Sequence, residues 1–291
     1  MLDETLADGD RAVVLSFTGV NSGVTHDRAV LQAAILKIKS QELNKRDPSQ
    51  CPSIDYYEAD QLINRNSKPD WDIAIERAAN CSHKGSKTDI GYVEQLVRMA
   101  ANQALIAGDM DVRATLGYLR DVVHSLSKMP GQRTLILVSP GFLSSSNEAL
   151  ALKSQILDLA ASSNVTISAL NASGLSGGGI GASDSTSGSV YNNITGQDVG
   201  NHLESIRTNE DVMAELANGT GGTFFNNNND LEAGLKTLAA GPDYRYLLQF
   251  SLDGVKQNGT YHSLKVEVDR SGVKVQARQA YFAPFPLGNK K

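Results

Sequence analysis

The sequence predicts an α/β fold, in which a mostly parallel sheet is covered by helices and is followed by an antiparallel β extension. Apolar strand-like runs alternate with amphipathic helical segments through residues 11–239, a pattern typical of βαβ units. The run Leu135–Val138 is continuously apolar and stops at Ser139-Pro140-Gly141, as a strand buried on both faces does. Residues 259–284 instead alternate between apolar and polar side chains, which predicts a hairpin with one buried face.

The elements follow from local patterns along the chain. Leu31, Ile35 and Ile38 fall on one face of a predicted helix, and Gly108-Asp109 is the place where a long helical region is expected to kink. Parallel strands are expected to include 11–18, 134–139 and 165–170, with a short strand at 222–225. Helices are expected at 27–43, 54–65, 70–80, 89–129, 147–162, 209–217 and 229–239.

These elements predict two domains. Residues 1–240 form the α/β domain, with a polar helical insertion at about 44–88 and a Gly/Ser-rich flexible loop at about 171–207. Residues 241–291 form the C-terminal β-strand extension. The Gly-rich stretch has neither the lysine nor the glycine spacing of a phosphate-binding loop, which favours a surface loop.

Composition excludes several classes of partner. The chain has 291 residues, 41% of them hydrophobic and 20% charged, and a formal net charge of −5. No apolar run is long enough to span a bilayer, and the scattered basic residues argue against nucleic acid as a partner. The opening residues, MLDETLADGD, are acidic and polar, so this chain has no signal peptide pattern.

The carboxyl end of the strand at 134–139 is the predicted binding edge, because open α/β sheets place their ligands there. Its candidate residues are Ser139, Gly141, Phe142 and Ser144. No Asp, Glu, His, Cys or Lys occurs from Leu135 through Asn147, and the serines lack the Gly-x-Ser-x-Gly pattern of a nucleophile elbow. The prediction is therefore a non-catalytic edge, with a hydrolase that recruits a distant histidine as the alternative.

The only two cysteines, Cys51 and Cys81, both lie in the polar insertion. A disulfide would close a loop of about 30 residues around two short helices that cannot build a large core. Two free thiols remain open, as does a zinc site that uses the nearby His83, although that site would lack a fourth ligand. A catalytic thiol lacks any supporting pattern.

Five separate blocks resemble one family in their order and spacing. They are RTLILVSPGF with the preceding MPGQ, then ALNASGL, AELANGTGGTFFNNNNDL, YRYLLQFS and YHSLKVEVDRSGVKVQARQAYFAP. Together they resemble the acidobacterial von Willebrand factor type A-related domain. The resemblance implies a Rossmann-like, von Willebrand factor A-type three-layer sandwich that lacks its first strand, with a C-terminal antiparallel β-hairpin extension.

Type A domains similar to this one hold a divalent cation through an Asp-x-Ser-x-Ser loop, a threonine and a strand-end Asp. This sequence contains no Asp-x-Ser-x-Ser, and its nearest run, Ser183–Ser187, falls in the Gly/Ser-rich loop. Ser139-Pro140 stands where the strand-end Asp is expected, and Thr115 is the positional match for the threonine, unless it is simply an exposed residue of an amphipathic helix. The resemblance thus implies a degenerate or truncated metal-ion-dependent adhesion site. No metal or cofactor is expected unless a missing N-terminal strand restores a Mg²⁺ site.

The resemblance also implies a function. It predicts a non-catalytic, adhesion-type protein-binding module of an exported bacterial protein, with a protein partner, no nucleic acid and no membrane span. A bridge between Cys51 and Cys81 would favour a periplasmic or secreted parent protein, since a reducing cytosol rarely keeps such bonds. The alternatives are a hydrolase at the Ser-rich strand end and a structural fragment without binding activity.

Overall fold

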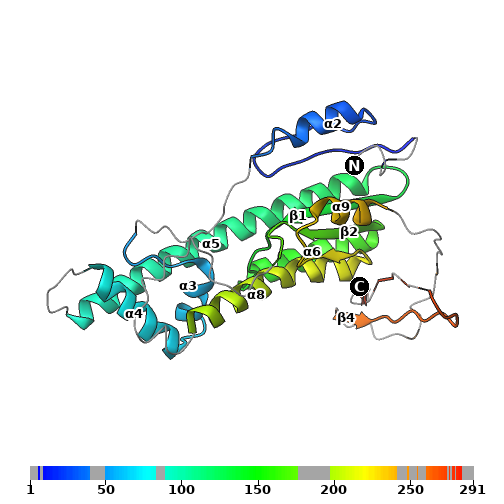
Figure 1. Cartoon of the computed structure of the whole chain (residues 1–291). Coiled ribbons are helices and arrows are strands. Elements are labelled where there is room, and N and C mark those ends of the chain that lie inside the picture. Colours follow the sequence, from blue (N-terminus) through cyan, green and yellow to red (C-terminus); the bar gives the residue numbers. More distant parts are fainter. Residues whose placement is uncertain are drawn as a thin grey trace, which may run out of the picture.

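The structure is a computed structural model, and it describes residues 6, 9–39, 50–82, 89–175, 197–240, 248, 254, 260–273, 275, 277–278 and 280–283. Figure 1 shows an elongated molecule in which one long helix, α5 (Ile90–Ser127), connects an insertion at one end with a sheet at the other. Among the described helices, none is both long and apolar enough to cross a membrane.

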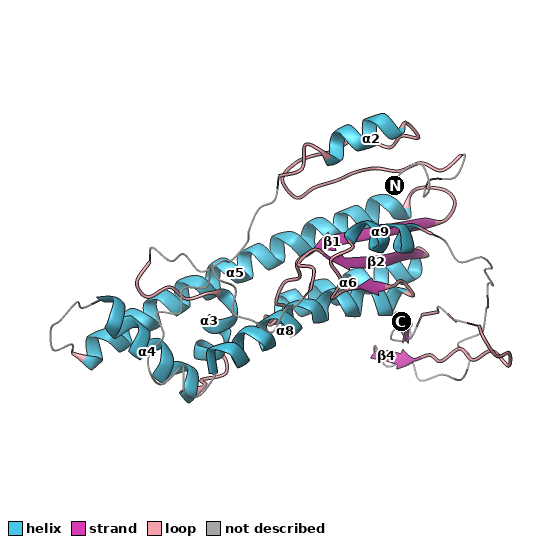
Figure 2. Ribbon diagram, viewed as in Figure 1, coloured by secondary structure: helices cyan, strands magenta, loops and turns pink. Residues whose placement is uncertain are grey.

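The central sheet is parallel, as predicted. Strands β1 (Arg133–Ser139), β2 (Val165–Asn171) and β3 (Phe224–Phe225) lie side by side in the order β1-β2-β3 (Figure 2). The register runs from Arg133 opposite Val165 to Ser139 opposite Asn171, so β1 and β2 end at the same level. The carboxyl end of β1 therefore forms one edge of the sheet, beside the end of β2.

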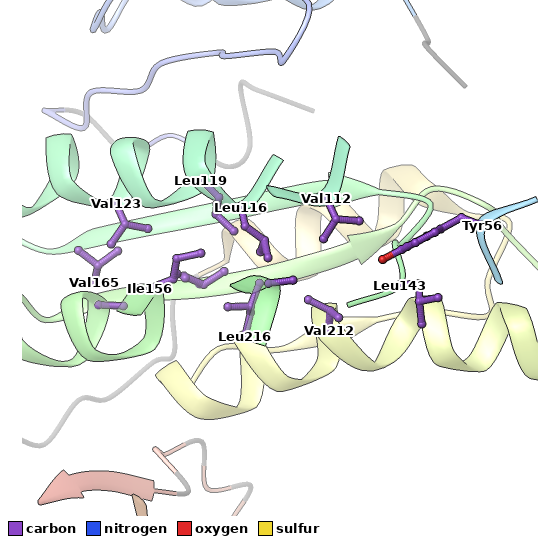
Figure 3. Close-up of a cluster of buried hydrophobic side chains, with 13 residues drawn as sticks. Tyr56, Val112, Leu116, Leu119, Val123, Leu143, Ile156, Val165, Val212 and Leu216 are labelled. Carbon is purple, nitrogen blue, oxygen red and sulfur yellow. The ribbon is translucent and has the colours of Figure 1, made fainter. Parts of the chain in front are cut away.

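Helices lie on both sides of the sheet and bury β2, whereas β1 is only partly covered. Val138 is 52% exposed, so the expectation that this strand is buried on both faces is wrong, because β1 is an edge strand of the described sheet. Helix α5, α6 (Asn147–Ser162) and α8 (Gln197–Thr220) share a core with Val165 and Ile167 on one face. The short helix α9 (Leu231–Ala239) approaches Leu170 on the other face, where a Cβ built on Gly234 would lie 3.0 Å from the leucine. The side chains of the main core are shown in Figure 3, and they are Tyr56, Val112, Leu116, Leu119, Val123, Leu143, Ala149, Ile156, Ala160, Val165, Ile167, Val212 and Leu216.

Residues 56–82 form a helical hairpin, at the place where two short helices are expected. Helices α3 (Tyr56–Ile63) and α4 (Lys68–Ser82) pack on the first half of α5 and form a second core around Leu62, Trp71 and Val97. Helix α5 itself runs without interruption for 38 residues, so Gly108 does not divide it into two helices. Gly108 serves a close side-chain approach, described below.

The segment 11–18 is not a strand of the parallel sheet, which corrects the prediction. Ala12 and Leu15 instead form isolated antiparallel bridges with Thr25 and Asn21. The turn between them is closed by a hydrogen bond from the Ser16 amide to the Val20 carbonyl at 2.9 Å. Because this turn folds the segment back on itself, its backbone groups pair with residues 20–25 and not with β1. Helix α2 (Arg28–Ile35) follows and is shorter than expected.

The described C-terminal residues form the predicted antiparallel pair. Strand β4 (Thr260–Ser263) pairs with β5 (Ala280–Ala283) in a separate two-stranded sheet. Arg278, which precedes β5, connects the C-terminal segment to the α/β domain. Its guanidinium donates to the Ala161 carbonyl at 2.9 Å and to the Asn164 side-chain oxygen at 3.3 Å. The YRYLLQFS block of the expected β-strand extension, residues 244–251, lies outside the described residues except for Leu248. Helix α8 begins at Gln197, so the loop expected to extend to 207 ends earlier, and 176–196 are not described.

Candidate functional site

The turn after β1 is packed tightly against α8. The Gly141 amide donates to the Ser139 hydroxyl at 3.1 Å, and the Phe142 amide donates to the Asn209 carbonyl at 3.0 Å. Gly141 has a φ of +93°, and a Cβ at this position would lie 2.6 Å from the Asn209 carbonyl oxygen. Glycine is therefore required here both by the backbone conformation and by the close approach. Phe142 is partly buried against the main core.

An open depression of about 500 Å³ lies beyond this turn. Three parts of the chain build it: α3 and the residues that follow it, the middle of α5, and the serine-rich segment that leads into α6. The lining residues are Asp60, Asn64, Arg65, Asp109, Ser144, Ser145, Ser146 and Asn147. The depression is thus polar and joins the insertion to the carboxyl end of β1.

Tyr56 connects the three parts. Its hydroxyl donates to the Asp109 carboxylate at 2.5 Å and lies 3.4 Å from the Ser145 hydroxyl. Since the single phenolic proton is used on Asp109, Ser145 is the donor to the Tyr56 oxygen. Tyr56 is only 5% exposed and lies at the carboxyl end of the strands, as Figure 3 shows. Burial, reinforced by the hydrogen bond to Asp109, raises the pKa of Tyr56 well above its usual value, so the phenol stays protonated at neutral pH.

Gly108 makes this position of Tyr56 possible. A Cβ on Gly108 would come within 2.1 Å of the Tyr56 ring, so only glycine lets the ring lie against the backbone of α5. The next residue along α5, Asp109, then meets the phenol. Gly108 and Asp109 together therefore hold α3 against α5, because the glycine leaves space for the Tyr56 ring and the aspartate accepts the phenolic hydrogen bond.

The remaining charges of the depression are paired. Asp60 is 2% exposed and accepts from Arg65 at 3.0 Å and from the Asn64 side chain at 2.8 Å. Beside the depression, Glu148 in the first turn of α6 forms an ion pair with Arg113 at 2.5 Å. These pairs fix the side chains of the wall rather than leaving them free to rearrange.

The insertion that carries Tyr56 is held by covalent and polar contacts. Cys51 and Cys81 form a disulfide, with their Cα atoms 5.9 Å apart. Arg77 of α4 forms an ion pair with the buried Glu58 of α3, and the Arg98 guanidinium lies 4.8 Å from the centre of the Trp71 ring. Together these contacts attach α3 and α4 to each other and to α5.

The structure places the five predicted edge residues in three different settings. Ser144 lines the depression, whereas Ser139, Gly141 and Phe142 belong to the turn packed on α8. Thr115 lies within α5 and is not among the residues that line the depression.

Sequence reasoning missed Tyr56, Asp60 and Asp109. Asp109 was noticed only as part of an expected kink. The available signal was Gly108 on the apolar face of a long helix, because a glycine in a helix interior costs stability unless something needs the space. The partner that needs it, Tyr56, is 52 residues away in the sequence and could not be assigned from the pattern.

The residues at this edge do not fit the divalent cation of a type A adhesion site. Mg²⁺ requires several hard oxygen ligands in near-octahedral geometry. Ser139 already accepts a backbone hydrogen bond, Thr115 lies elsewhere, and Asp60 is occupied by Arg65 and Asn64. Among the described residues, no group of three or more His, Cys, Asp or Glu side chains has an arrangement that could hold a metal ion.

The end of β2 carries a second polar cluster, but its acceptors are filled. Asn171 donates to one Glu210 oxygen at 2.5 Å, and Asn226 donates to the other at 3.2 Å. This cluster therefore fastens α8 to the strand ends and has less capacity for a ligand than the depression.

Comparisons with protein-family models, with curated proteins and with solved structures found no match to this chain.

Proposed function

We propose that the chain is a non-catalytic protein-binding module of the von Willebrand factor type A-related kind, and that its partner docks over the depression beyond β1. The observation that carries the proposal is the construction of that depression. Three distant segments meet there around the hydrogen bonds that join Ser145, Tyr56 and Asp109. Open α/β sheets use this edge for binding, and the depression is too open and polar to enclose a small apolar ligand.

The chemistry of the lining supports binding rather than catalysis. A serine nucleophile needs a general base, and the residues that line the depression include no histidine. Tyr56, the phenol within reach of Ser145, keeps its proton because burial and Asp109 raise its pKa. The residues therefore favour recognition over hydrolysis at the serine-rich segment.

The disulfide supports the exported character of the parent protein. Disulfides persist in oxidising compartments and are rare in the cytosol. The bridge between Cys51 and Cys81 cross-links the same insertion that supplies Asp60 to the lining of the depression and Tyr56 to the hydrogen bonds with Asp109 and Ser145. An oxidising compartment would thus also preserve the proposed binding surface.

Selection of a random peptide library against the oxidised full chain tests the proposal. Selected peptides should bind the wild type and lose at least about tenfold in affinity for Asn147→Trp, because a large ring would fill the depression. Gln103→Trp, at an exposed position of α5 outside the depression, is the matched control and should bind as the wild type does. Failure to select any peptide, or equal binding to both variants, would contradict a docking site here.

A further inference from the structure

The hydrogen bonds around Tyr56 leave acceptors available on Asp109 and Ser145. The Ser145 proton goes to Tyr56 and the Tyr56 proton goes to Asp109, so both bonds run toward the carboxylate. Ser145 retains lone pairs, and the Oδ2 atom of Asp109 accepts no hydrogen bond from any described residue. A ligand with several donors would complement this arrangement.

Ser144 adds a hydroxyl group that can accept or donate a hydrogen bond. Its hydroxyl oxygen is buried and has no hydrogen-bond partner among the described residues, although the residue lines the depression. A buried hydroxyl without a partner destabilises a protein, because no hydrogen bond offsets the loss of its hydration. A ligand that donates to Ser144 would remove this cost upon binding.

The charges around the depression leave one carboxylate without a cation. Arg65 is paired with Asp60, and Arg113 is paired with Glu148. Arg113 also donates its Nε to the Asp109 backbone carbonyl at 3.1 Å, so it contacts the main chain rather than the carboxylate. Among the described residues, no cation forms an ion pair with Asp109.

The N-terminus of α6 does not make the depression a site for an anionic ligand. A helix N-terminus attracts anions, but Ser146 caps the Ala149 amide and Glu148 supplies the complementary negative charge. An acidic ligand in the depression would therefore meet Asp60 and Asp109, next to a helix end whose charge and amide groups are already satisfied.

We propose that the depression binds the ammonium or guanidinium group of a lysine or arginine of a partner protein, with Asp109, Ser144 and Ser145 as its acceptors. This inference rests on the proposed function, because it assigns the chemistry of the partner at that site. Lysine and arginine carry only donors, which matches a set of unfilled acceptors. A divalent cation is disfavoured because a single uncommitted carboxylate oxygen and neutral hydroxyls do not offset the loss of its hydration shell. The site thus reverses the polarity of a type A adhesion site, where a cation binds an acidic residue of the partner.

The probes are the blocked amino acids Nα-acetyl-arginine amide and Nα-acetyl-lysine amide, titrated into the isotopically labelled full chain. Saturable changes are expected in the backbone amide NMR signals of residues 108–110 and 144–147, with dissociation constants in the millimolar range. Nα-acetyl-norleucine amide, which keeps the aliphatic chain without the charge, and Nα-acetyl-glutamate amide should leave these signals unchanged.

Three variants assign the binding. Asp109→Asn should weaken both basic probes about tenfold, since a charged acceptor binds a charged donor more strongly than a neutral amide does. Ser144→Ala should weaken them about threefold while it leaves the Tyr56 bonds intact. Asp121→Asn, an acid of the same helix with a side chain 72% exposed, is the control and should bind as the wild type does.

Each remaining outcome counts against the inference. Equal shifts by the norleucine or glutamate probe, no saturation with either basic probe, or an Asp109→Asn variant that binds like Asp121→Asn would overturn it. Micromolar Mg²⁺ binding that is lost in Asp109→Asn would replace it with a metal site. Selected peptides that require the depression but contain no Lys or Arg would overturn this inference while the proposed function stands.

Discussion

The Tyr56 ring lies against the backbone of α5 at Gly108, so closely that a Cβ at residue 108 would come within 2.1 Å of the ring. A glycine in the interior of a helix is less favourable than alanine by about 1 kcal/mol. The contact offsets this cost, because the ring is buried in the main core and its hydroxyl reaches Asp109. The position of the insertion relative to the sheet thus depends on a residue with no side chain.

Replacement of Gly108 with alanine should therefore destabilise the protein by about 2 kcal/mol, since overpacking in a core costs about 1–3 kcal/mol. Gly117→Ala is the matched control in the same helix, where a Cβ meets nothing within 4 Å. This change should stabilise the protein by up to about 1 kcal/mol, through helix propensity alone. Urea unfolding measures both variants, and equal stabilities for the two would show that the close contact does not exist.

The raised pKa of Tyr56 predicts a loss of stability at high pH. Below the unfolded tyrosine pKa of 10.0 both states are protonated and the contribution is fully present. As the pH rises above that value, the unfolded state ionises while the buried phenol resists, so stability is lost by about 1 kcal/mol at pH 11. Tyr56→Phe should remove this component of the pH dependence. Urea unfolding of the two proteins at pH 8 and pH 11 checks it, and parallel losses would contradict the assignment to Tyr56.

The parts of the fold that the sequence predicts correctly are those determined by local pattern. The apolar run of β1 and the amphipathic spacing of α6 identify both elements almost to the residue, and the turn at Pro130-Gly131 marks where β1 begins. The segment 11–18 has the same apolar character, but its pairing was decided by the turn at 16–20. Strand propensity does not specify a partner, which is why this segment was assigned to the wrong sheet.

The candidate site was harder to predict, because its polar residues belong together only through tertiary packing. The serine-rich segment was visible from the strand end, whereas Tyr56 and Asp109 lie in an insertion and in a long helix. Each looks like an ordinary core or surface residue of its own element. Only the contact at Gly108 brings them to the serines.

The disulfide should be intact in protein exported to an oxidising compartment. Denatured, unreduced protein should then take up no alkylating label on Cys51 or Cys81, and reduction before alkylation should add two labels by mass. Closing a loop with a sequence separation of 30 should stabilise the fold by about 3.5 kcal/mol in the chain-entropy model. A double Cys51→Ser, Cys81→Ser variant should match the reduced protein in stability. Two labels without reduction would show that the thiols are free.

Ser139 should contribute to stability rather than to cation binding. Its hydroxyl accepts the Gly141 amide at 3.1 Å and so holds the turn that packs on α8. Ser139→Ala would leave that amide without its partner and should lower the free energy of unfolding by about 1 kcal/mol, measured in urea.

Calorimetric titration with Mg²⁺ or Mn²⁺ should give no micromolar binding in either the wild type or the Ser139→Ala variant, because the residues at this edge offer too few uncommitted carboxylate oxygens to offset cation dehydration. Micromolar binding that disappears in Ser139→Ala would show instead that the serine is a metal ligand and that the turn opens to admit the ion.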